Sequence, residues 1–230
     1  MVFDVFGTVV DWRNSVSREV ARVARAKRVA LDSDQFADAW RARYHPSMNR
    51  VRTGAQPWTH LDALHRASLD ELLREFRLDG MSDAEVDHLN RVWHRLRPWP
   101  DAVAGLKRLK KRYVLATLSN GNVALLTNMG KFAKLPWDCI LSAELFHHYK
   151  PDPEVYLGAA ALLGLAPAQV MMVAAHKNDL DAAKRCGLMT AFVHRPREHG
   201  QAKKADDMSP APYIDIAARD FNALAAKLGL

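Results

Sequence analysis

Four short apolar segments of the sequence are each followed by polar side chains that could do chemistry. The first segment ends at Asp4, with Thr8 just beyond it, and the segment 113–118 is followed by Ser119 and Asn120. An aspartate carboxylate can act as a covalent nucleophile, and hydroxyl and amide groups can donate hydrogen bonds to a bound anion. The first two segments therefore supply one nucleophile candidate and one hydroxyl–amide pair.

Two later segments add a cation, an acid and a histidine. Lys150 lies in the loop after a short apolar segment at 139–141, and the segment 170–174 is followed by His176 and Asp179. In an open parallel sheet, ligands bind outside the carboxyl ends of the strands. Any one of these groups could follow a strand by chance, but all of them together are much less easily explained that way. We therefore expect them to meet at one edge of a sheet.

The elements that must position these groups alternate between strand and helix in the second half of the chain. Short apolar runs bounded by turn residues predict the strands, and apolar residues at helical spacing predict the helices. Alternation with short connections is typical of a doubly wound parallel sheet, so the predicted fold class is α/β with a Rossmann-like core. The predicted strands are 2–6, 113–118, 139–141, 170–174 and 190–193, and the predicted helices are 102–111, 123–132, 153–163, 180–186 and 217–228.

A long helical segment interrupts this alternation after the first strand. Apolar side chains such as Phe36, Trp40 and Tyr44 recur at helical spacing, and the segment shows no strand pattern. An insertion of this kind predicts an all-helical cap over the sheet. The expected division is a cap at 13–96 and a core domain made of 1–12 and 97–230.

Composition and charge are ordinary for a soluble globular protein. Of the 230 residues 49% are apolar, the net charge is +7, and no apolar stretch is long enough to span a membrane. The positive charge is scattered and no nucleic-acid motif accompanies it, so we expect neither a nucleic-acid nor a membrane partner. We find no secretory signal and expect a cytoplasmic protein. The polar segment 195–215 predicts a long surface loop, to which the sequence assigns no function.

The ordered motifs resemble those of the haloacid dehalogenase superfamily. They are Asp4-Val-Phe-Gly-Thr8, Ser119-Asn120, Lys150-Pro-Asp-Pro153 and the late Asp179. The resemblance covers essentially the whole chain, and the helical insertion after the first motif is similar to that superfamily's cap. Four motifs in the right order are a strong signal, whereas the first motif alone would be a moderate one.

Two departures narrow the resemblance. Phosphatase members of the superfamily carry a second aspartate two residues after the nucleophile, where this chain has Phe6. They also carry an extra acid before the last one, where this chain has Ala174, Ala175 and His176. Magnesium prefers octahedral oxygen ligation, for which this site is poor in carboxylates. The Asp-x-aromatic-Gly-Thr pattern is instead similar to the type II 2-haloacid dehalogenases.

This resemblance implies a hydrolase that uses no metal and no cofactor. Asp4 would displace halide from C2 of a small 2-haloalkanoic acid, an L-2-haloacid or a haloacetate such as fluoroacetate, and form an ester on its own side chain. Water would then release the 2-hydroxy acid. The expected partners are the anionic haloacid and halide, and a homodimer is implied by the resemblance alone.

The resemblance also assigns roles to individual residues. Arg41 would bind the halide, and only the resemblance favours it over Arg43. Asn120 would be a second donor to the halide or the carboxylate, and Trp58 would line the halide pocket. Ser119 and backbone N–H groups near Phe6 would bind the substrate carboxylate. Lys150 would keep Asp4 ionised and Thr8 would hydrogen-bond it, whereas Tyr156 matches a tyrosine of the family but could equally be a packing residue.

The activation of the hydrolytic water stays open at this stage. Asp179 would orient Lys150 or polarise the water. His176 stands where the dehalogenases carry asparagine, and it could act as a general base or only fill that place with hydrogen bonds. Two alternative functions are a magnesium-dependent phosphatase for a small phosphate ester and a non-catalytic module of the same fold.

Overall fold

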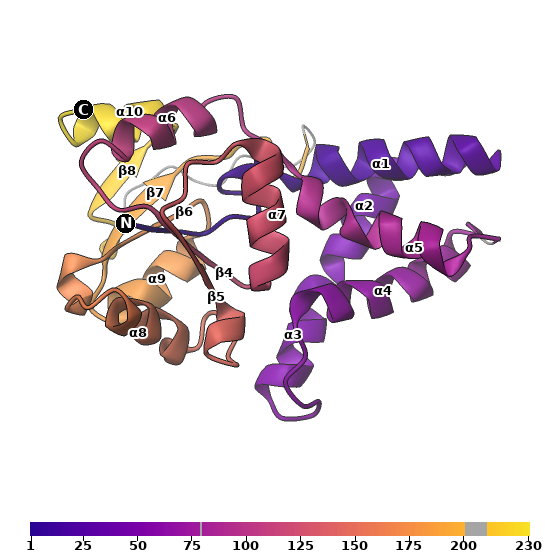
Figure 1. Cartoon of the computed structure of the whole chain (residues 1–230), viewed down its shortest axis with the longest axis horizontal. Helices are drawn as coiled ribbons and strands as arrows, with labels where there is room; N and C mark the ends of the chain where they lie inside the picture. The colour runs from indigo at the N-terminus through magenta and orange to yellow at the C-terminus, as the bar shows by residue number, and fades with distance from the viewer. Residues whose placement is uncertain (79, 201–210) are drawn as a thin grey trace.

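The computed structural model describes residues 1–78, 80–200 and 211–230, and these residues contain a six-stranded parallel sheet (Figure 1). The strand order is β5-β4-β1-β6-β7-β8, with β1 at a central position. The predicted α/β fold class is confirmed. The strands are β1 (Val2–Phe3), β4 (Ala116–Ser119), β5 (Cys139–Ser142), β6 (Met171–Ala174), β7 (Met189–Val193) and β8 (Ile216–Ala218).

Helices cover both faces of this sheet because successive strand side chains point to opposite sides. Phe3 of β1 belongs to one apolar cluster with Leu125 and Phe221, whereas the neighbouring Val2 belongs to a second cluster with Tyr156 and Leu180. The first cluster is contributed in part by α6 (Ala102–Leu109), α7 (Val123–Ala133) and α10 (Phe221–Lys227), and the second by α8 (Pro153–Leu162) and α9 (Lys177–Arg185).

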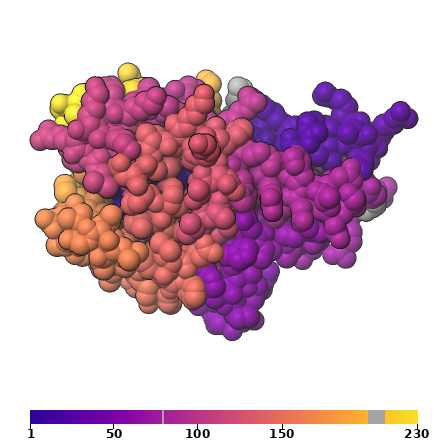
Figure 2. Space-filling view, in the orientation of Figure 1, coloured from indigo at the N-terminus to yellow at the C-terminus, as the bar shows by residue number. Residues whose placement is uncertain are grey.

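The chain leaves and re-enters the sheet domain through a short antiparallel pair of strands. Val10 of β2 (Val10–Asp11) pairs with Pro98 of β3 (Arg97–Pro98). Between them the described residues form helices and turns, which make a lobe beside the sheet (Figures 1 and 2). The helices are α1 (Trp12–Lys27), α2 (Ser33–Ala42), α3 (Tyr44–Arg52), α4 (Leu61–Glu75), α5 (Asp83–Asn90) and a 3-10 helix (Arg91–Arg95), which packs against α7.

The C-terminal end differs from the sequence prediction. We expected one helix over 217–228, but Ile216–Ala218 forms the edge strand β8 and the helix begins only at Phe221. The reason is local, since the Asp220 side chain accepts a hydrogen bond from Ala223 N and caps α10 at that point. Two short 3-10 helices, Ala143–Leu145 and Pro167–Gln169, complete the elements. No helix in the described ranges is long and apolar enough to cross a membrane.

Candidate active site

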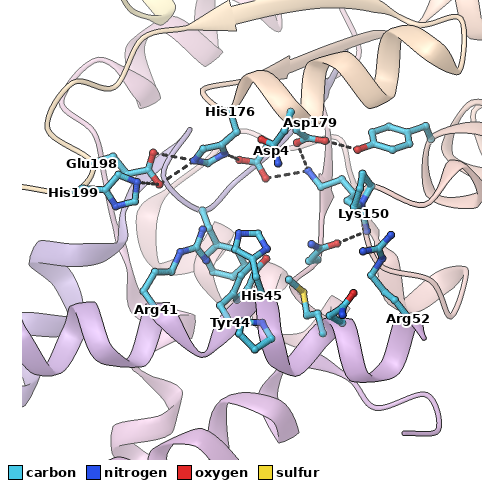
Figure 3. Close-up of a pocket in the computed structure, with 18 residues that line it drawn as sticks. Asp4, Arg41, Tyr44, His45, Arg52, Lys150, His176, Asp179, Glu198 and His199 are labelled. Carbon is cyan, nitrogen blue, oxygen red and sulfur yellow. Dashed lines mark hydrogen bonds and ion pairs between the residues drawn. The ribbon is translucent and has the colours of Figure 1, made fainter. Parts of the chain in front are cut away.

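A cavity of about 620 Å³ lies between the carboxyl ends of the strands and helices α2 and α3 (Figure 3). The loops after β1, β4, β5, β6 and β7 all contribute to it, as the parallel sheet requires. The sheet side supplies Asp4, Phe6, Asn120, Lys150, Pro151, Tyr156, His176, Asn178, Asp179, Glu198 and His199, and the helical side supplies Arg41, Tyr44, His45, Pro46, Met48, Asn49 and Arg52.

Asp4 is buried at the end of β1 with both carboxylate oxygens engaged. Thr8 donates a 2.7 Å hydrogen bond to Oδ2, Lys150 Nζ lies 3.0 Å from Oδ1, and His176 Nδ1 lies 3.2 Å from Oδ2. Burial alone would raise the pKa of Asp4, but the charges of Lys150 and His176 hold the pKa well below its usual range. The carboxylate is therefore ionised at neutral pH, as a nucleophile must be.

Lys150 joins Asp4 to Asp179. Its ammonium lies 2.5 Å from Asp179 Oδ2, and the other Asp179 oxygen accepts a 2.6 Å hydrogen bond from the Tyr156 hydroxyl. Burial would lower the pKa of Lys150, but the charges of the two carboxylates raise it above its usual value. The lysine is positioned through its backbone, because Lys150 N donates a 2.8 Å hydrogen bond to Asn120 Oδ1.

His176 bridges Asp4 to a carboxylate that the sequence analysis missed. His176 Nε2 lies 3.0 and 2.9 Å from the two oxygens of Glu198, which is only 4% exposed. Burial would lower the pKa of His176, but the charges of Glu198 and Asp4 raise it to about 10. The ring is therefore an imidazolium between two carboxylates while Asp4 is ionised.

The prediction that 195–215 is a surface loop is thus wrong near its start, where Glu198 is buried. Glu198 follows β7 and accepts a 3.1 Å hydrogen bond from Trp12 Nε1, so this segment turns back into the pocket. The same strand-end rule, applied to the strand predicted at 190–193, would have indicated it. Residues 201–210 of the predicted loop lie outside the described residues.

Arg41 and Arg43 occupy different environments although they are two residues apart. The Arg41 guanidinium lines the pocket, lies 4.1 Å from the centre of the Tyr44 ring, and has a buried Nη1 with no hydrogen-bond partner in the part of the chain that is described. Arg43 instead donates to Glu75 at 2.6 Å on the helical lobe. Of these two arginines, Arg41 is the one that lines the pocket with an unpartnered donor, as an anion site requires.

The structure leaves three of the predicted site residues outside the pocket lining. Thr8 is buried behind the lining, where its hydroxyl donates a hydrogen bond to Asp4 and accepts one from Ala175 N at 2.9 Å. The Ser119 hydroxyl is fully buried and accepts a 3.3 Å hydrogen bond from Gly121 N, so it supports its own loop. The prediction for Trp58 is not met, because this ring stacks on His147 with centroids 5.2 Å apart.

Phe6 fills the place where an acid would be needed for phosphoryl transfer. Its ring packs edge-on against Tyr44 and Trp93, with centroids 6.3 and 5.9 Å away. A phenyl ring neither ligates a metal nor transfers a proton. Within residues 1–78, 80–200 and 211–230, no group of three or more His, Cys, Asp or Glu side chains is placed to hold a metal ion.

The arrangement can attack an electrophilic carbon and bind the anion that leaves. A buried, ionised carboxylate faces the cavity, one lysine neutralises it, and an arginine on the opposite wall has a donor nitrogen without a partner. Fixed donors aimed at developing negative charge stabilise a transition state more than a ground state. Such a site suits nucleophilic displacement of an anionic leaving group.

Comparisons with known proteins give a consistent picture. A family model described as haloacid dehalogenase-like hydrolase matches residues 1–187. The chain is 32% identical over 197 residues to (S)-2-haloacid dehalogenase 4A of Burkholderia cepacia, covering 84% of this chain and 82% of that protein. It resembles the crystal structure of a defluorinating L-2-haloacid dehalogenase, with 48% sequence identity and a TM-score of 0.96. The match covers 100% of this chain and 94% of that chain. A second L-2-haloacid dehalogenase structure has 47% sequence identity and a TM-score of 0.94, and the match covers 99% of this chain and 97% of that chain.

Proposed function

The chain belongs to the haloacid dehalogenase-like hydrolases, and on that premise we propose that it hydrolyses the carbon–halogen bond of small (S)-2-haloalkanoic acids and haloacetates. The observation that carries the proposal is the buried Asp4 carboxylate, ionised beside Lys150 and facing the free Arg41 donors. The two solved L-2-haloacid dehalogenases at 48% and 47% identity support the substrate class, and the name of the first supports fluoride as one leaving group.

The reaction starts with Asp4. One carboxylate oxygen attacks C2 of the haloacid from the side opposite the halogen, the carbon–halogen bond breaks, and the electron pair leaves with the halide. Arg41, and Asn120 from the opposite wall, donate hydrogen bonds to the departing anion. Lys150 and Thr8 hold the attacking carboxylate in place, so that little reorganisation is needed at the moment of reaction.

The substrate must also be oriented by its own carboxylate. Backbone N–H groups of the loop around Phe6 are the proposed donors, and Ser119 keeps the neighbouring loop in shape through Gly121. Phe6 and Tyr44 supply an apolar wall beside C2. The second half of the reaction returns Asp4 to its carboxylate when water attacks the ester carbonyl and releases the 2-hydroxy acid.

This chemistry needs no metal, because a halide leaves as an anion without a proton. A magnesium-dependent phosphatase is not favoured, since Phe6 stands where such enzymes carry one acid and the segment near Ala175 lacks the other. A non-catalytic module is not favoured either, since the ion pairs of Asp4, Lys150 and Asp179 are all intact. We further propose a homodimer on the basis of the resemblance alone, and a cytoplasmic location, with which the free thiols of Cys139 and Cys186 are compatible.

The test is halide release from fluoroacetate, chloroacetate and both enantiomers of 2-chloropropionate, with EDTA present. A phosphate-ester assay with magnesium runs beside it. The proposal predicts EDTA-resistant halide release with preference for the (S) enantiomer. Magnesium-dependent phosphate release without halide release would refute it. Light scattering in solution tests the homodimer.

A further inference from the structure

We propose that His176, held by Glu198, is the general base that activates water for hydrolysis of the Asp4 ester. The inference rests on the proposed function and assigns a catalytic residue and a positioning residue to its second half. The geometry is a continuous chain from Asp4 Oδ2 through the imidazole to Glu198 (Figure 3). Trp12 Nε1 in turn donates a 3.1 Å hydrogen bond to Glu198 Oε1.

The Glu198 contacts decide which ring nitrogen can accept a proton. An ionised carboxylate only accepts hydrogen bonds, and both Glu198 oxygens face Nε2 within 3.0 Å. Nε2 therefore keeps its hydrogen in either protonation state of the ring. When the ring is neutral, Nδ1 is the free acceptor, and Nδ1 is the nitrogen that lies 3.2 Å from Asp4.

Formation of the ester switches this nitrogen from donor to acceptor. While Asp4 is ionised, its charge and that of Glu198 keep His176 protonated. The ester carries no charge on Asp4, so one of the two carboxylates that stabilise the imidazolium is lost and the ring can release its Nδ1 proton to solvent. The base thus becomes available only after the halide has left.

The steps balance in atoms and charge. Water attacks Cγ of the ester while His176 Nδ1 takes one of its protons. The tetrahedral intermediate collapses by breaking the bond between Cγ and the substrate oxygen, and the departing alkoxide takes the second water proton. The products are the 2-hydroxy acid, the Asp4 carboxylate and the imidazolium of His176, which is the starting state. The single proton lost per turnover is the one that His176 gave to solvent.

Asp179 is less suited to this task in the structure. Both of its oxygens are already occupied, one by the Lys150 ammonium at 2.5 Å and the other by the Tyr156 hydroxyl at 2.6 Å. Burial raises the pKa of Asp179, but to accept a proton from water it would have to give up one of these two partners. We assign it to holding Lys150.

The other charged groups around His176 do not supply a competing base. The groups that face it across the pocket are Asp4 with its partner Lys150, Glu198, Arg41, His45 and His199. Arg41 is a cation, and burial together with the charges of Arg41 and His176 lowers the pKa of His45. His199 lies 3.9 Å from Glu198, on the far side of the carboxylate from the His176 ring.

Glu198→Gln and His176→Asn test the assignment, with Glu154→Gln on α8 as a matched surface control. Halide release in the first turnover and the later release of 2-hydroxy acid are followed separately by rapid quench, and the ester is detected by mass spectrometry of the intact protein. We expect H176N to release about one halide per active site and to accumulate the ester, with deacylation slowed by about 10²–10⁴-fold. E154Q should behave like the wild type.

The pH dependence of the deacylation rate in E198Q shows whether Glu198 positions and charges His176 or has only a structural role. Loss of the Glu198 charge lowers the pKa of His176, so the acid limb of the deacylation rate should move to lower pH. The plateau rate should fall at the same time, because a weaker base remains and the amide can donate to Nε2. An unmoved limb would overturn the role of Glu198.

The remaining outcomes distinguish this inference from the proposed function. A wild-type protein that releases no halide from any haloacid would refute the proposed function itself. Steady turnover of H176N without accumulated ester would overturn only the assignment of the base. Accumulation of ester in Asp179→Asn but not in H176N would also overturn it and place the base at Asp179.

Discussion

The side-chain ammonium of Lys150 lies 3.0 Å from Oδ1 of Asp4, and both groups are buried. Their separation in the chain is 146 residues, so the contact exists only because β1 and the loop after β5 end at the same edge of the sheet. A charge pair in this position keeps the nucleophile ionised and holds it in one orientation.

Lys150→Met is expected to lower the rate of halide release by about 10²–10³-fold, because a preorganised cation at the reacting centre is lost. Without that cation the pKa of Asp4 rises, so the acid limb of halide release should move to higher pH. Stopped-flow halide detection across a pH series measures both effects. Lys131→Met on α7 serves as the control, and unchanged halide release in K150M would remove Lys150 from the site.

The same substitution carries a cost in stability. It leaves Asp4 and Asp179 buried without the ammonium that joins them, which is expected to lower the free energy of unfolding by about 3–5 kcal/mol. Urea denaturation followed by circular dichroism gives this value. It also shows whether the protein used in the kinetic experiment is folded.

Arg41→Lys is expected to lower kcat/KM for 2-chloropropionate by about 10²-fold, because an ammonium cannot present the planar fork of donors that faces the pocket. Arg43→Lys is the matched control, since Arg43 bonds Glu75 on the helical lobe. The measurement is steady-state halide release by both variants. Equal losses in the two variants would contradict the assignment of Arg41.

Gly7→Ala is expected to slow deacylation through Glu198. Gly7 has φ +80°, and a Cβ atom there would lie 2.0 Å from Glu198 Oε1, so the carboxylate would have to leave His176. Gly54→Ala separates this effect from backbone strain, because Gly54 has φ +74° and open space around it. Both variants should lose about 1–2 kcal/mol of stability, and only G7A should accumulate the ester. A G7A enzyme with normal deacylation would contradict this contact.

These contacts also show what the sequence could predict. Asp4, Lys150, His176 and Asp179 each follow a strand, and parallel pairing brings strand ends together, so their meeting was predictable. The choice between Arg41 and Arg43 was not, because both lie near one helix end and only the packing of α2 turns one of them into the pocket.

Other differences between the prediction and the structure come from contacts between distant parts of the chain. Glu198 lies in a polar segment without periodicity, and its burial depends on Trp12, which is 186 residues away in the chain. Tyr44 follows the apolar helical pattern, which does not reveal that this residue also lines the pocket. The predicted helix over 217–228 wrongly included part of strand β8. Ile216–Ala218 becomes a strand only by pairing with β7, which a local sequence pattern does not show.

Asp101→Asn tests the part of the fold that supports the loop after Asp4. Arg195 donates to both Asp101 oxygens at 2.7 and 3.0 Å and to Thr8 O at 2.8 Å. Burial would raise the pKa of Asp101, but the Arg195 contacts lower it below its usual value. The carboxylate therefore stabilises the fold above about pH 4, and this stabilisation is lost as the pH falls further.

The variant D101N should accordingly lower the free energy of unfolding by about 1–3 kcal/mol at pH 7, and the difference from wild type should shrink toward pH 3. Urea denaturation at a series of pH values measures it. Asp181→Asn, which removes an exposed pair with Arg185, should change stability by no more than about 0.5 kcal/mol. A difference that stays constant with pH would argue against an ionic contribution from Asp101.

The most direct test of the central claim is a single turnover in H₂¹⁸O with enzyme in excess over (S)-2-chloropropionate. If Asp4 is the nucleophile, the oxygen added to the substrate comes from its carboxylate, so the lactate formed should contain ¹⁶O and the peptide containing Asp4 should gain ¹⁸O. Label in the lactate and none in Asp4 would mean that water attacks C2 directly, and would contradict the covalent mechanism.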